Sequence, residues 1–103
     1  MADPFTVLAE PNRRRILDSL RGSERSVGDL VTALALPQPA VSKHLKVLRE
    51  AGLVSVRTAA QQRIYRIEPR PLRTVDAWLA PYRALWTKHL DALGRHLDEL
   101  EPS

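Results

Sequence analysis

The chain has 103 residues, about one domain, with no cysteine and no apolar run near the roughly 20 residues that span a membrane. This composition excludes disulfides, thiolate metal sites and a cysteine nucleophile, and the N-terminus MADPFTVLAE lacks the features of a signal peptide, so we expect a cytoplasmic protein. The net charge of +4 is uneven, because residues 1–70 hold 12 Lys and Arg against 7 Asp and Glu, which points to a polyanionic partner for this part.

Three short helices are predicted before residue 37. The first follows Asp3, a capping carboxylate with a proline after it, and the second starts at Pro11. The third follows Ser26, whose spacing to Asp29 is that of a capping box. It ends before Pro37, because proline cannot continue a helix.

The fourth helix covers QPAVSKHLKVLRE and ends at Gly52. At about 100° per residue, Val41, Leu45 and Leu48 form one narrow apolar stripe. The other side is polar and basic and consists of Pro39, Ser42, Lys43, Lys46 and Glu50. Gln38 and Arg49 lie at its border. Residues 37–66 hold 6 basic residues against 1 acidic residue, so we expect this side of the helix to face DNA.

Two strands are predicted next, in residues 53–58 (LVSVRT) and 63–68 (RIYRIE). The four residues between them, AAQQ, contain no glycine, so we expect a longer and mobile hairpin tip rather than a tight two-residue turn.

The last segment is one long amphipathic stretch, which Pro81 is expected to kink or split. Its apolar stripe has more surface than one small domain can cover, so we interpret it as a dimer interface rather than an intramolecular core. The predicted interface residues, two of them in the first helix, are Phe5, Leu8, Trp78, Tyr82, Leu85, Trp86, Leu90, Leu93 and Leu97.

The predicted fold is therefore mainly α with a β-hairpin wing: a winged helix-turn-helix domain with the order helix, helix, helix, helix, hairpin, long helix. We expect a single domain over residues 1–103, with the helix-turn-helix at 26–51 and the wing at 53–68. The motifs PNRRRILDSL (11–20), SVGDLVTAL (26–34), QPAVSKHLKVLREAGLV (38–54) and RIYRI (63–67) resemble the ArsR-type (ArsR/SmtB superfamily) bacterial transcriptional repressors.

The resemblance implies a homodimer that binds double-stranded operator DNA and represses transcription, often that of its own operon. Residues 1–10 and 71–101 would form the dimerisation helices, and the helix at 38–51 would enter a major groove. The matching positions expected to approach DNA are Gln38, Pro39, Ser42, Lys43 and His44, with Arg57 and Arg63 on the wing. Lys46 and Arg49 lie further along the helix and are expected to meet phosphates.

Two further predictions concern basic residues outside the motif's centre. Arg14 and Arg15 are candidates for DNA backbone contacts, whereas Arg13 shares the apolar side of its helix and is predicted to form an ion pair within the fold. The chain also departs from the family, because Pro37 stands where a capping Ser or Thr is usual and the wing tip lacks the common glycine.

Metal sensing is an alternative that the sequence leaves open. His96 and Glu99 match half of a metal set found on the last helix of ArsR relatives, but Arg83 and Leu85 stand where Asp and His are needed. His89 and His96 are seven residues apart and could join their dimer mates in a zinc site, or act as a pH-sensitive pair.

Other classes of function have less support. We find no Ser–His–Asp arrangement, glycine-rich phosphate loop or paired-carboxylate site, so no enzyme and no cofactor are expected. A protein-interaction module would need an apolar or acidic outer face on the fourth helix, where this chain is basic. The sequence indicates no particular inducer.

Overall fold

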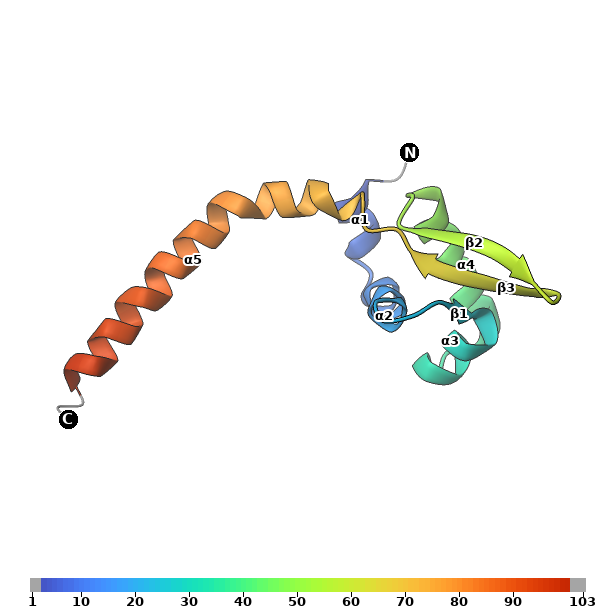
Figure 1. The fold of residues 1–103 in the computed structure, drawn as a ribbon, viewed down its shortest axis with the longest axis horizontal. Coiled ribbons are helices and arrows are strands. Elements are labelled where there is room, and N and C mark those ends of the chain that lie inside the picture. Colours follow the sequence, from blue (N-terminus) through green and yellow to red (C-terminus); the bar gives the residue numbers. More distant parts are fainter. Residues whose placement is uncertain (1–2, 101–103) are drawn as a thin grey trace. The chain divides into compact units, whose positions relative to one another are not determined.

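The computed structural model describes residues 3–100, and the side chains of residues 3–95 (Figure 1). The elements are α1 (Pro4–Leu8), α2 (Pro11–Leu20), β1 (Arg25–Ser26), α3 (Val27–Leu34), α4 (Gln38–Glu50), β2 (Val54–Ala59), β3 (Gln62–Ile67) and α5 (Leu72–Leu100). The chain divides into two compact units, Met1–Arg73 and Thr74–Ser103, and each is described by itself. The predicted winged-helix order is confirmed.

The helix starts follow the predicted capping chemistry. Asp3 caps α1, where its side chain accepts a hydrogen bond from the backbone N–H of Thr6 at 3.4 Å. Ser26 and Asp29 form a reciprocal capping box at α3, in which each side chain accepts from the other residue's backbone N–H at 3.1 Å. Pro37 precedes α4 and supplies no side-chain cap, as the sequence predicts.

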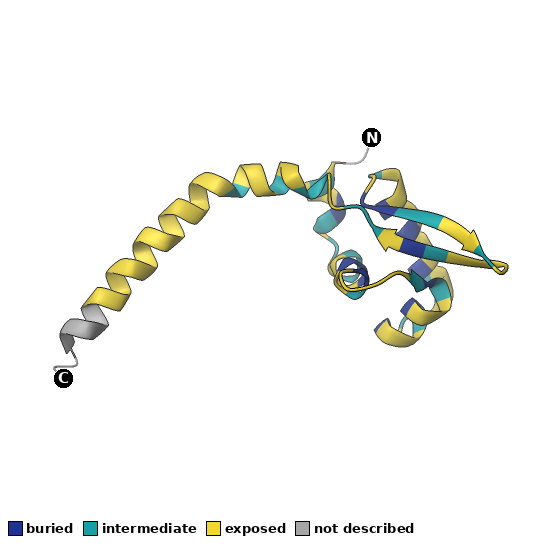
Figure 2. Ribbon diagram, in the orientation of Figure 1, coloured by how far each residue is buried: buried dark blue, intermediate teal, exposed yellow. Residues whose placement is uncertain are grey.

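The core of the first unit lies between the helices and one face of the hairpin (Figure 2). The predicted stripe of α4 is fully buried, because Val41, Leu45 and Leu48 are all 0% exposed. The other buried apolar residues are Val7, Ile16, Leu17, Leu20, Leu30, Leu34, Leu53, Val54 and Tyr65. Burial of the inner stripe fixes which side of α4 remains at the surface.

The sheet has three antiparallel strands in the order β1-β3-β2. The sequence predicted β2 and β3 but missed β1, whose two residues are too few to carry a strand pattern. The register pairs Val56 with Tyr65, and Arg57 with Ile64. Since directly paired residues share a face and neighbours alternate, this register decides which wing residues lie toward α4.

The hairpin tip differs from the prediction of a long, mobile loop. Ala59 pairs with Gln62, so only Ala60 and Gln61 form the turn. Both have positive φ, 50° and 69°, as a type I′ turn requires. The prediction was wrong because it treated glycine as obligatory, whereas the twist of the two strands here imposes the left-handed backbone on ordinary residues.

The second unit is formed by α5 from Thr74 onward. Pro81 lies inside α5 and does not split it, so of the two expected outcomes, a kink or a split, the split does not occur. Proline removes one N–H and opposes the carbonyl of Ala77. Because this part of the helix is exposed, water can satisfy that carbonyl. Among the described residues, no helix combines the length and apolar character that crossing a membrane requires.

Candidate nucleic-acid interface

The outer side of α4 carries polar and basic side chains at the surface. The stripe of Val41, Leu45 and Leu48 points into the core, so the opposite side of the helix faces solvent. The exposed members of the predicted site on this helix are Gln38, Pro39, Ser42, Lys43, Lys46 and Arg49. A major groove admits one α-helix, so these residues of a single helix could enter it together.

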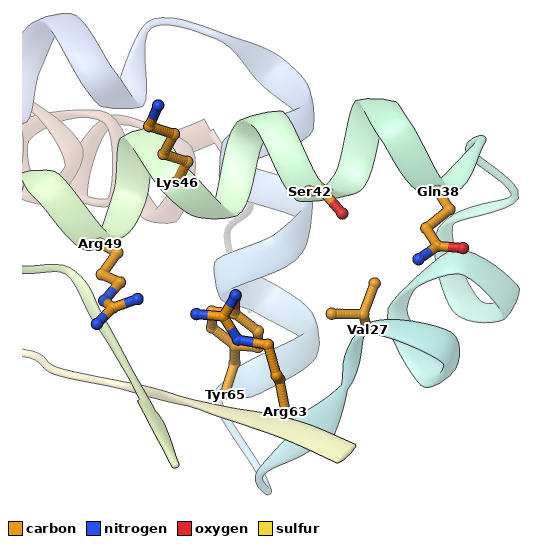
Figure 3. Close-up of a pocket in the computed structure, with 7 residues that line it drawn as sticks. All are labelled: Val27, Gln38, Ser42, Lys46, Arg49, Arg63 and Tyr65. Atoms are coloured by element: carbon orange, nitrogen blue, oxygen red, sulfur yellow. The ribbon is translucent and has the colours of Figure 1, made fainter. Parts of the chain in front are cut away.

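A hollow of about 500 Å³ separates α4 from the wing (Figure 3). Its lining residues are Val27, Gln38, Ser42, Lys46, Arg49, Arg63 and Tyr65. Three of these seven carry a positive charge and none carries a negative charge. The hollow therefore favours an anion, and it joins helix residues to one wing residue of the predicted site.

Arg63 lies on the face of the sheet that turns toward α4. Residues 63 and 65 share one face of β3, and the ring of Tyr65 on that face is buried. The Arg63 guanidinium carbon lies 5.9 Å from the centroid of this ring, a cation–π distance, and Figure 3 shows the two groups one in front of the other. The buried ring thus supports an exposed cation beside the hollow.

Arg57 lies on the opposite face of the sheet. It pairs with Ile64, whose side chain points to the other face of β3 from that of Arg63. Its Nε and Nη2 donate to one carboxylate oxygen of Glu24 at 3.0 and 2.6 Å. The hydrogen bond from Arg57 holds the pKa of Glu24 below its ordinary value of 4.5. The sequence grouped Arg57 with Arg63, but the structure separates them.

Arg66 is also held by a carboxylate. Its Nε donates to Glu68 at 3.0 Å and to the hydroxyl of Ser55 at 3.0 Å. The hydroxyl of Ser55 donates to Glu68 at 2.8 Å. The hydrogen bonds from Ser55 and then Arg66 lower the pKa of Glu68 from its ordinary 4.5. Two of the three wing arginines are therefore paired within the protein.

His44 turns away from the other predicted DNA contacts. Its side chain is 16% exposed, and its Nε2 lies 3.8 Å from a carboxylate oxygen of Glu10. Glu10 also caps α2, where it accepts from the backbone N–H of Arg13 at 3.0 Å. The structure therefore places His44 at the junction of α4 with α2 rather than among the exposed residues of α4.

The arginines of α2 cap other helices. Arg14 donates to the carbonyl oxygens of Leu8 and Ala9 at the end of α1, at 2.6 and 3.2 Å. Arg15 donates to the carbonyl of Leu34 at the end of α3, at 2.9 Å. These contacts satisfy carbonyls that a helix end leaves unpaired.

Arg13 does not form the predicted ion pair among the described residues; its Nη1 donates to the carbonyl of Val7 at 3.4 Å. Sequence reasoning also missed Val27, Tyr65 and Glu24. The alternation of Arg63 with Tyr65 carried a usable signal for the tyrosine, whereas nothing local linked Glu24 to Arg57, 33 residues away.

The described part of α5 exposes a long row of large apolar side chains. Trp86 is 54% exposed and Leu93 is 47% exposed. A hollow of about 510 Å³ on this helix is lined by Leu85, Trp86, His89 and Leu90. The exposed residues of the predicted interface are Phe5, Trp78, Tyr82, Leu85, Trp86, Leu90 and Leu93.

Four other candidates have different surroundings. Leu8 is half-buried and packs against the core of the first unit. The side chains of Leu97, His96 and Glu99 lie outside the described residues. Within residues 3–95, no group of three or more His, Cys, Asp or Glu side chains is placed to hold a metal ion.

Comparison with known proteins agrees with this geometry. The family model described as bacterial regulatory protein, arsR family, matches residues 10–56. An HTH-type transcriptional regulator of Mycobacterium tuberculosis is 36% identical over 94 residues, which are 91% of this chain and 85% of the relative. The chain belongs to the ArsR family.

Other ArsR-type relatives support the same assignment. A biofilm growth-associated repressor of Agrobacterium fabrum is 41% identical over 78 residues, 75% of this chain and 67% of that protein. The crystal structure of a possible transcriptional regulator for arsenical resistance matches with a TM-score of 0.71 and 35% identity, over 93% of this chain and 97% of that one. This ArsR-family protein is a DNA-binding transcriptional regulator and not an enzyme.

Proposed function

We propose that this ArsR-family regulator is a cytoplasmic homodimeric repressor that binds a near-palindromic operator, with autoregulation of its own gene as the first target to test. The observation that carries the proposal is the exposed, basic side of α4 together with the hollow that it shares with the wing. Because the lining of the hollow holds three cations and no anion, the surface complements a polyphosphate backbone.

The proposed docking places α4 in the major groove. Gln38, Ser42 and Lys43 lie in its first two turns, where a recognition helix contacts base edges. Glutamine suits adenine, lysine suits guanine and serine takes either. Lys46 and Arg49 lie further along and meet phosphates, which position the protein without reading sequence.

The proposed dimer uses the apolar side of α5. The described helix exposes leucine and tryptophan side chains in a continuous row, and exposed apolar surface of this extent marks an interaction site. A second copy of the same helix offers a matching apolar surface, so a two-fold arrangement buries both. Such a dimer would place two α4 helices on half-sites about 34–36 Å apart, one turn of the duplex.

Fluorescence anisotropy tests the proposal with DNA from upstream of the protein's own gene, against scrambled competitor. We expect tight, competitor-resistant binding in chelator that added zinc leaves unchanged. Release by zinc would instead favour the metal-sensing alternative through His89 and His96. Equal binding to scrambled DNA would remove this operator from the proposal, and no binding to any duplex would overturn DNA recognition by α4.

A further inference from the structure

The wing presents its arginines to two different surroundings. Arg63 borders the hollow beside α4, whereas Arg57 lies on the other face of the sheet and is paired with Glu24. Both side chains are exposed, so exposure does not distinguish them. The strand register and the position of the Glu24 carboxylate distinguish them.

Glu24 is well placed to restrain Arg57. It lies in the segment between α2 and β1, outside the hairpin, and one oxygen accepts from both Nε and Nη2. A guanidinium held at two nitrogens has a fixed direction, and its charge is offset locally. The hydrogen bond from Arg57 lowers the pKa of Glu24, so the carboxylate is charged throughout the neutral range and can offset the guanidinium.

We infer that Glu24 is a positioning residue that holds Arg57 back from DNA. Arg63, supported by the Tyr65 ring, is then the wing cation that joins Arg49 and Lys46 in a phosphate site. The inference rests on the proposed function and deepens it. It assigns one counterion-releasing contact to the wing of each protomer, where the sequence alone allowed two. Arg49 and Arg63 reach the same hollow from α4 and from β3 (Figure 3).

The salt dependence of binding measures such contacts directly. Each phosphate contact releases counterions and contributes about 0.9 to the slope of log K against log salt. The probe is a short fluorescent duplex of random sequence, titrated at several KCl concentrations, so the measurement needs no operator. The variants are Arg63→Ala, Arg57→Ala, Glu24→Gln and the double variant Glu24→Gln/Arg57→Ala, with Arg66→Ala as a matched control, since Arg66 is also paired and on the outer face.

We expect Arg63→Ala to lower the slope by about 0.9 for each bound protomer, whereas Arg57→Ala and Arg66→Ala leave it unchanged. Glu24→Gln removes the carboxylate charge that offsets Arg57, so the slope should rise by up to about 0.9, and adding Arg57→Ala should cancel that rise. Arg63→Lys, which keeps the charge, should restore the slope. A simple structural role for Glu24 would not make the effect of Arg57→Ala depend on the residue at position 24.

A loss of slope in Arg57→Ala equal to that in Arg63→Ala would overturn the inference, as would a double variant with the slope of Glu24→Gln alone. Thermal unfolding of the wild type, Glu24→Gln, Arg57→Ala and their double variant without DNA separates this inference from the proposed function. If the wild type binds no duplex while Glu24→Gln and Arg57→Ala remain non-additive in Tm, the restraint stands, whereas DNA recognition and the role of Arg63 fall.

Discussion

Two lysines of α4 differ in their surroundings and should differ in their effects on DNA binding. Lys43 is exposed but does not line the hollow, whereas Lys46 does. We predict that Lys43→Ala weakens operator binding by about 1–3 kcal/mol and relaxes preference at one base pair. The matched variant Lys46→Ala should weaken operator and random DNA alike and lower the salt slope by about one. Anisotropy on both duplexes checks this, and equal losses for Lys43→Ala would refute base reading.

Asp29 gives a single-residue prediction on pH. The hydrogen bonds with the backbone and then the side chain of Ser26 lower the pKa of Asp29 from its ordinary 3.8. A carboxyl group whose pKa is lowered by folding stabilises the fold at pH values above its pKa in the unfolded chain. This stabilisation is lost as the pH falls below 3.8 toward the lower pKa of the folded state. Asp29→Asn should therefore reduce Tm at neutral pH and flatten its acid dependence. Parallel acid curves for the two proteins would exclude this role.

In the hairpin turn the backbone adopts a conformation that its non-glycine residues disfavour. Gln61 has φ of 69°, a conformation that costs an ordinary residue roughly 1–2 kcal/mol and glycine nothing. After the entropic cost of glycine, Gln61→Gly should stabilise the protein by roughly 0.5–1 kcal/mol, which a Tm increase would report. Gln62→Gly, one residue later in β3, should lower Tm instead. Equal decreases would show that the turn carries no strain.

The same elements show what the sequence could predict. Caps and apolar periodicity located every helix, because Ser26 with Asp29 and the stripe from Val41 to Leu48 depend on local chemistry alone. The contacts of Arg15 and Arg57 within the fold were not predicted, since their partners Leu34 and Glu24 lie 19 and 33 residues away. Side-chain hydrogen bonds between distant segments depend on tertiary packing, which no local pattern records.

At the scale of the whole molecule, the two units contribute different surfaces. The first unit buries its own core and presents basic residues, whereas the described part of α5 leaves most of its large apolar residues exposed. A small domain gains stability by covering such surface in an oligomer. Dimerisation would also double the phosphate contacts per complex, so assembly and DNA affinity should fail together.

Trp86 and Leu93 lie on one side of α5, seven residues apart, and both are about half exposed. Trp86→Glu or Leu93→Glu would place carboxylates where two apolar helices meet, so we predict monomers that bind DNA poorly. Ala84→Glu is the matched control, since position 84 lies about 160° around the helix from Trp86 and should leave the dimer intact. Light scattering measures the mass in each case. A monodisperse dimer from Trp86→Glu and Leu93→Glu would place the interface elsewhere, and a monomeric wild type would require one protomer to supply the whole DNA contact.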